Sequence, residues 1–186
     1  MTVHPIEAES YRIMAGRIDL SELDAGRRAV VERVIHASAD FEYASTMRID
    51  DGAVEAAVDA LRNGAPVVTD VEMVRAGIPG AVCHLPASAG AASTRSAAGI
   101  REAAHIHPEG AVVVVGCAPT ALVEAVELDW EPAVIVGLPV GFVGAAESKA
   151  LARASRHRTI TNVGEKGGSA VAAAAVNAMR RLADGR

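Results

Sequence analysis

The sequence has few aromatic residues and no excess of positive charge. Aromatic residues make up 3% of the 186 positions, so platforms on which nucleic-acid bases stack are not expected. Lysine and arginine number 18 against 23 acidic residues, which gives a net charge of −5. A nucleic-acid-binding surface needs basic residues to neutralise phosphates. The composition therefore argues against a nucleic-acid partner.

The sequence also has few cysteines and no long hydrophobic run. Cys83 and Cys117 lie far apart, so they form neither a CxxC metal-binding pair nor a disulfide framework. The beginning of the chain, MTVHPIEAES, contains no apolar signal-peptide core. No apolar run approaches the roughly 20 residues that span a bilayer. We therefore expect a reduced, cytoplasmic protein without a membrane partner.

What the sequence does contain is aliphatic material for a core. Hydrophobic residues make up 51% of the chain, and Ala and Val must do most of the filling because aromatics are scarce. Domains usually contain roughly 100–200 residues. The sequence shows no low-complexity linker and no internal repeat. We therefore predict one domain over residues 1–186.

Short apolar runs alternate with segments of helical periodicity. The clearest buried strand is AVVVV at residues 111–115. Further strands are predicted at 66–69, 81–85, 133–136 and 159–163. Helices are predicted at 21–36, 51–64, 95–105, 119–128, 145–154 and 168–182, with a brief one before Gly77. Strands that are apolar on both faces and separated by helices imply a parallel sheet covered on both sides. The predicted fold class is therefore a single-domain, doubly wound α/β fold with a mostly parallel sheet.

Ligands in such folds bind beyond the carboxyl ends of the strands. This rule selects five loops, which hold many of the glycines and unusual polar residues: 70–73, 86–96, 116–120, 137–144 and 164–169. Three of them are glycine-rich and lead into helices, whose free N–H groups attract anions. Neither the GxGxxG nor the GxxxxGK[ST] spacing is present. The pattern favours a carboxylate- or phosphate-bearing ligand at this edge.

Individual candidate residues have two interpretations each. Residues 93–96, STRS, open a helix, and either bind an anion or simply cap the helix beside a surface arginine. His36 ends an amphipathic helix, where the helix C-terminus favours its imidazolium form and a role as general acid. The ordinary alternative, a half-buried structural histidine, is favoured by the residues alone. His105 and His107 are two positions apart and point apart on a helix, so a metal site is not expected there.

Several segments together resemble the precorrin-8X methylmutase family. The most specific is PVGFVGAAESK at residues 139–149, and the resemblance covers nearly the whole chain in order. The other matching segments are His36-Ala37, PVVTDVEM at 66–73, TRSAA at 94–98, APTAL at 118–122 and GGSA at 167–170. The family usually has Asn at the position of Cys117, and the segment between Leu85 and Ser93 is shorter here.

The resemblance implies an α/β homodimer with its site near the dimer interface. It implies an isomerase of cobalamin biosynthesis that moves a methyl group from C11 to C12 of the corrin ring. Precorrin-8X becomes hydrogenobyrinate, or the cobalt form becomes cobyrinate, without a metal or organic cofactor of the enzyme. By resemblance, His36 matches the catalytic histidine, Ser10 a substrate-contacting serine in the family's first helix, and Arg95 the arginine that follows the threonine.

These implied roles define a hypothesis for the tetrapyrrole substrate. His36 protonates the ring system while the methyl group migrates. Polar side chains and helix N-termini bind the acetate and propionate carboxylates. The polar residues expected at these carboxylates are Ser10, Thr94, Arg95, Ser96 and Lys149. Met73 and Phe142 are expected against the apolar face of the macrocycle.

Two other functions remain open on the sequence alone. One is another doubly wound enzyme that acts on a small anionic substrate, with phosphate held by the glycine loops. The other is a non-catalytic carrier that binds the corrinoid product and leaves precorrin-8X unchanged. Binding of nucleotides and sugar phosphates, compared with corrinoids, separates the first alternative, and turnover separates the second.

Overall fold

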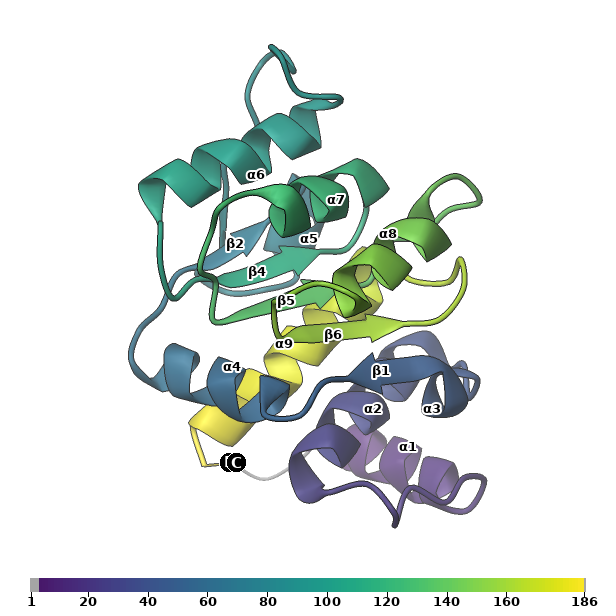
Figure 1. Cartoon of the computed structure of the whole chain (residues 1–186). Coiled ribbons are helices and arrows are strands. Elements are labelled where there is room, and N and C mark those ends of the chain that lie inside the picture. The colour runs from purple at the N-terminus through teal and green to yellow at the C-terminus, as the bar shows by residue number, and fades with distance from the viewer. Residues whose placement is uncertain (1–3, 186) are drawn as a thin grey trace.

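The computed structural model describes residues 4–185, which form a six-stranded sheet between two layers of helices (Figure 1). The strands are β1 (Met47–Ile49), β2 (Val67–Thr69), β3 (Val82–Cys83), β4 (Val112–Val115), β5 (Val134–Gly137) and β6 (Thr159–Asn162). The helices are α1 (Pro5–Ala15), α2 (Ala25–Ser38), α3 (Tyr43–Thr46), α4 (Ala53–Arg62), α5 (Glu72–Ala76), α6 (Arg95–Ile106), α7 (Pro119–Glu127), α8 (Ala145–Arg153) and α9 (Ser169–Ala183). In this part of the chain, no helix has the length and apolar character needed to cross a membrane.

The sheet is mostly parallel, as predicted. Its strand order is β1-β6-β5-β4-β2-β3, and every pair is parallel except β1 with β6. The central strand β4 pairs with β2 and β5 in register, with Val113 opposite Val68 and Ile135. The α/β fold class is therefore confirmed, and the carboxyl ends of five strands lie along one edge.

Both faces of the sheet are packed with aliphatic side chains. Along β4, Val112 and Val114 join the core under α2, α4, α5 and α9, whereas Val113 and Val115 join the core under α6, α7 and α8. All four valines are fully buried. Figure 1 shows the two helical layers on opposite sides of the sheet. This two-sided burial is the physical reason for the unbroken apolar runs in the sequence.

Four elements near the N-terminal end of the chain differ from the prediction made from residue patterns. The helices α1 and α3 and the antiparallel edge strand β1 were not predicted, and α2 begins at Ala25 rather than near Ser21. The Asp24 carboxylate caps α2 by accepting from the Arg27 N–H at 2.9 Å, so the capping residue lies later than expected. Strand β1 has three residues, too few for the alternation of buried and exposed positions to be recognisable.

A buried carboxylate joins two loops at the carboxyl edge of the sheet. Asp70, 1% exposed, accepts hydrogen bonds from the backbone N–H groups of Gly116, Cys117 and Ala118 at 3.1, 2.9 and 2.8 Å. Burial raises the pKa of the Asp70 carboxyl, and the three amide donors oppose that rise because they stabilise the charged form. The loop 116–120 was predicted to offer these amides to a ligand. They are instead occupied by an anion of the protein itself.

Candidate functional site

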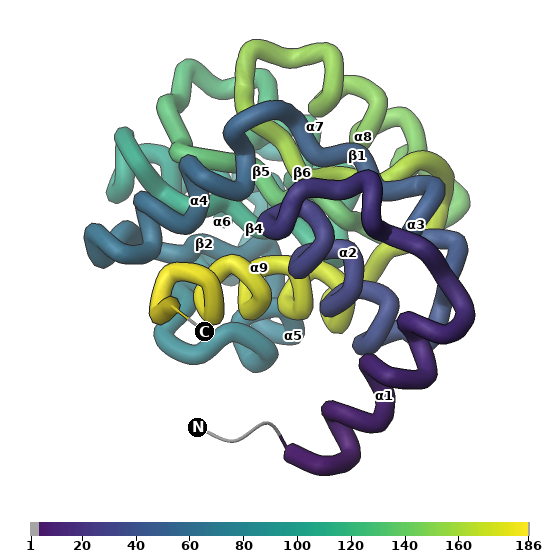
Figure 2. The backbone as a smooth tube through the Cα atoms, turned by 90° about the horizontal axis from the view of Figure 1, so that it is seen from below, coloured from purple at the N-terminus to yellow at the C-terminus, as the bar shows by residue number. Residues whose placement is uncertain are grey.

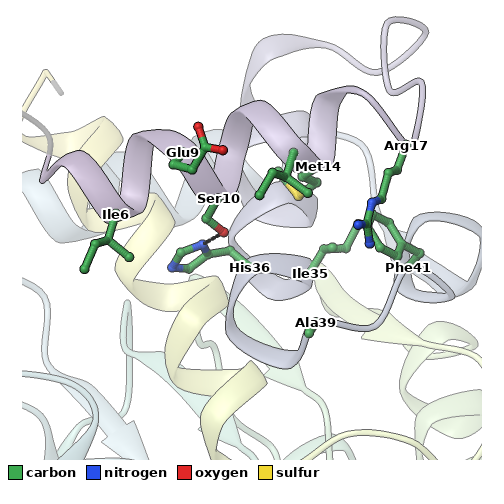
Figure 3. Close-up of a pocket in the computed structure, with 10 residues that line it drawn as sticks. Ile6, Glu9, Ser10, Met14, Arg17, Ile35, His36, Ala39 and Phe41 are labelled. Carbon is green, nitrogen blue, oxygen red and sulfur yellow. Dashed lines mark hydrogen bonds between the residues drawn. The ribbon is translucent and has the colours of Figure 1, made fainter.

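A pocket of about 340 Å³ lies between α1 and the C-terminal end of α2 (Figure 3). Most of its walls are apolar, with a few polar side chains among them. Its lining residues are Ile6, Glu9, Ser10, Ile13, Met14, Arg17, Ile35, His36, Ala39 and Phe41. An apolar hollow with few polar groups is the usual form of a small-molecule site.

Ser10 and His36 meet in this pocket, although 26 positions separate them in the sequence. The Ser10 Oγ and the His36 Nδ1 lie 2.8 Å apart, which is a hydrogen bond (Figure 3). The other ring nitrogen, Nε2, has no hydrogen-bond partner within residues 4–185. With Nδ1 occupied by the serine hydroxyl, Nε2 is the nitrogen free to exchange a proton with a ligand.

The surroundings of His36 set its protonation. The Tyr11 ring stacks on the imidazole, with centroids 5.2 Å apart and planes 5° from parallel. Burial and the positive charge of Arg33, with a further contribution from Arg181, hold the pKa of His36 below its ordinary value, while Glu7 raises it. Burial and the arginines therefore act against the imidazolium form that the helix C-terminus was expected to favour.

Tyr11, Arg17 and Phe41 belong to this region and were missed by the sequence analysis. The Arg17 guanidinium lies over the Phe41 ring at 6.0 Å from its centroid, at one end of the pocket (Figure 3). Such a cation, held against an aromatic face, suits a carboxylate arm of a ligand. The sequence signal for a helix at α1 was weak, since α1 carries polar residues on its inward face and lacks an apolar stripe.

Thr94, Arg95 and Ser96 begin α6, which packs on the other face of the sheet from α2. The Thr94 hydroxyl accepts from the Ala97 N–H at 3.1 Å and lies 2.8 Å from the hydroxyl of Thr120, so Thr94 caps the helix and links it to α7. Arg95 is exposed, and its Nε donates to the Pro86 carbonyl at 2.7 Å. None of the three lines the pocket of His36 in this chain.

The remaining predicted contacts differ in accessibility. Met73 and Phe142 are 71% and 93% exposed, so both are available to a ligand or a partner, although neither lines the His36 pocket. Lys149 is fully buried, and its ammonium donates to the Asn162 Oδ1 at 3.0 Å and to the Lys166 carbonyl at 2.7 Å. Burial lowers the pKa of Lys149 to about 8. The prediction that Lys149 meets the substrate does not fit this position, because its ammonium faces the loop interior.

Metal-binding residues do not gather anywhere in the described part of the chain. Within residues 4–185, no group of three or more His, Cys, Asp or Glu side chains is arranged to hold a metal ion. His84 and His107 approach each other, with ring centroids 5.6 Å apart, but no third ligand joins them.

Comparisons with known proteins identify the family. The sequence profile of the precorrin-8X methylmutase family matches residues 5–182. The chain is 42% identical over 175 residues to cobalt-precorrin-8 methylmutase of Methanothermobacter thermautotrophicus, covering 88% of this chain and 84% of that protein. It is 41% identical over 194 residues to precorrin-8X methylmutase of Pseudomonas aeruginosa, covering 94% and 93%. The crystal structure of precorrin-8x methyl mutase from Thermus thermophilus matches with a TM-score of 0.85 and 37% identity over 98% of each chain. The chain therefore belongs to the precorrin-8X methylmutase family.

Proposed function

We propose that this chain is an isomerase that moves a methyl group from C11 to C12 of precorrin-8X or its cobalt form, with His36 as general acid. The observation that carries the proposal is the imidazole of His36, anchored at Nδ1 by Ser10 and free at Nε2 beside an apolar pocket. Family membership supplies the substrate class, because relatives are named for both forms of the substrate.

The reaction needs no nucleophile and no redox group. A methyl shift requires the macrocycle to be held in one tautomer while a proton is delivered as its conjugation changes. His36 donates that proton from Nε2, and Ser10 fixes the ring so that the donor points into the pocket. Because an isomerisation leaves the atomic composition unchanged, the proton returns to the imidazole before the product leaves.

The rate of the reaction is expected to depend on pH through His36. Burial and the neighbouring arginines lower the pKa of His36 and so favour the neutral imidazole over the imidazolium. Bound carboxylates stabilise the imidazolium and raise this pKa again. We therefore expect kcat/KM to fall as the pH rises through a value below 6.5, and kcat to fall at a higher pH. Initial rates measured across the pH range test this, and two profiles with the same midpoint would contradict it.

The pocket holds only part of such a substrate. Its volume of about 340 Å³ lies at the small end of the range for ligand sites, and a tetrapyrrole with its acid arms is larger. Two pocket-lining side chains of α1, Ile6 and Ile13, are 74% and 40% exposed. We propose that a second copy of the chain covers them and completes the site, as the family resemblance implies. Light scattering of the full chain measures this assembly.

Arg95 provides the second prediction. We expect Arg95→Ala to weaken substrate binding by about 1–3 kcal/mol, with a smaller effect on kcat, because it removes a charged donor to a carboxylate. Arg101→Ala on the same helix is the matched control, since Arg101 pairs with Glu124 at 2.6 Å. Titration of both variants with hydrogenobyrinate measures the change. An affinity for Arg95→Ala equal to that of the control would remove Arg95 from the site.

The proposed function itself is tested by incubation with precorrin-8X and, in parallel, with its cobalt form. Conversion is followed by the change of the visible spectrum to that of the product. Turnover of either substrate supports the isomerase. Binding of hydrogenobyrinate without turnover would support the carrier, and tight binding of a nucleotide without corrinoid affinity would support a different anionic substrate.

A further inference from the structure

Helix α1 is attached to the body of the protein mainly through polar contacts. Its side chains toward α2 are Glu7, Ser10, Tyr11 and Met14, which are spaced as one face of a helix. Within α1, Met14 is the one buried residue, and it is 6% exposed. Figure 2 shows the helix projecting from the body beyond α2. The apolar contact that usually holds a helix in place is therefore small here.

Glu7 links α1 to two other helices through ion pairs. Its Oε1 accepts from the Arg33 Nη1 on α2 at 2.6 Å and from the Arg181 Nη1 on α9 at 2.7 Å. The side chains of Glu7 and Arg33 are 18% and 22% exposed, so water screens this pair less than it screens the exposed pair of Arg12 with Glu9 on the same helix. One carboxylate oxygen thus connects three helices, and the two arginines hold the pKa of Glu7 below its ordinary value.

The cluster lies one helical turn from the catalytic imidazole on both helices. On α1, Ser10 and Tyr11 follow Glu7 by three and four positions, and they hold and stack on His36. On α2, Arg33 precedes His36 by three positions. Because a helix is rigid over one turn, fixing Glu7 against Arg33 fixes the height and rotation of α1 over the imidazole.

We infer that Glu7 is a positioning residue for His36, and that its clamp with Arg33 and Arg181 keeps Ser10 and Tyr11 on the imidazole. The purpose of the clamp rests on the proposed function, because an oriented ring matters for proton delivery. The clamp itself is formed by side chains of the protein alone. It can therefore be measured without any substrate.

The test is NMR of the full chain, uniformly isotope-labelled and without substrate, with the His36 signals assigned from their loss in His36→Ala. In Glu7→Ala we expect the His36 ring protons to move downfield, because the shielding by the stacked Tyr11 ring is lost. We also expect the amides of α1 to exchange about tenfold faster or more, the change that follows from losing charge-assisted hydrogen bonds. The matched control is Arg12→Ala, which breaks the exposed 2.6 Å pair with Glu9 on the same helix.

A second variant tests the clamp from the opposite side. Arg181→Ala leaves the sequence of α1 unaltered. We expect the His36 ring protons to move downfield here too, but by less, because Arg33 still holds Glu7. Unchanged His36 resonances and unchanged exchange in Glu7→Ala would overturn the inference, as would equal changes in Arg12→Ala. Should Glu7→Ala fail to fold, Arg181→Ala decides. A chain that passes these tests and fails to convert precorrin-8X would leave the clamp standing and remove the proposed function.

Discussion

Replacing His36 by alanine is expected to reduce turnover of precorrin-8X by about 10²–10⁴-fold, the usual contribution of a positioned general acid. The half-buried ring contributes one side-chain hydrogen bond, to Ser10, so we expect the fold and the affinity for hydrogenobyrinate to be largely retained. Single-turnover assays with substrate in excess of its dissociation constant measure the chemical step. Thermal unfolding measures the stability of the fold, and titration with hydrogenobyrinate measures the affinity.

His105→Ala is the control for this experiment. His105 is an exposed histidine in the last turn of α6 and lines none of the His36 pocket. The His105→Ala variant should retain the turnover of the unaltered chain. Full turnover in His36→Ala would remove His36 from the mechanism, and loss of binding together with turnover would assign it to substrate binding.

Replacing Asp70 by asparagine is expected to lower the free energy of unfolding by about 2–3 kcal/mol, because buried amides lose their acceptor. The two carboxylate oxygens receive three N–H donors from the loop after β4. An asparagine amide has one acceptor oxygen, so its NH₂ group would face at least one of these donors. Urea unfolding followed by circular dichroism measures the difference.

The matched control is Asp59→Asn on α4. Asp59 is 70% exposed and pairs with Arg62 at 3.5 Å, so its substitution should change the free energy of unfolding by less than about 0.5 kcal/mol. A loss in Asp70→Asn no larger than in this control would show that the three amides find other partners.

The sequence predicted the helices and strands that are specified by residues close together in the sequence. The valines of β4 are buried on both faces, and the run AVVVV shows this directly. Helix α6 begins at Arg95 after the capping residue Thr94, as the STRS segment predicts. The sequence left open whether Thr94 caps the helix or binds an anion. The structure shows the capping hydrogen bond. Its contact with substrate stays a prediction.

The elements that were missed depend on contacts with residues far away in the sequence. Helix α1 faces the body with glutamate, serine and tyrosine, whose partners are supplied by α2 and α9. Periodicity of apolar residues cannot detect such a helix. Lys149 follows a glycine-rich loop and looks like an anion ligand, but its acceptors are Asn162 and the Lys166 carbonyl, which β6 and the loop after it bring to it.

By itself, the sequence determined the layered α/β fold and the family, because the apolar runs and the PVGFVGAAESK segment are each contiguous. Only the tertiary structure decided how the imidazole of His36 is held. Ser10 lies 26 positions from His36, and Arg181 lies 174 positions from the carboxylate of Glu7 that it holds. Such pairs form when packed helices bring distant segments together, and no local pattern specifies which polar groups will then face one another.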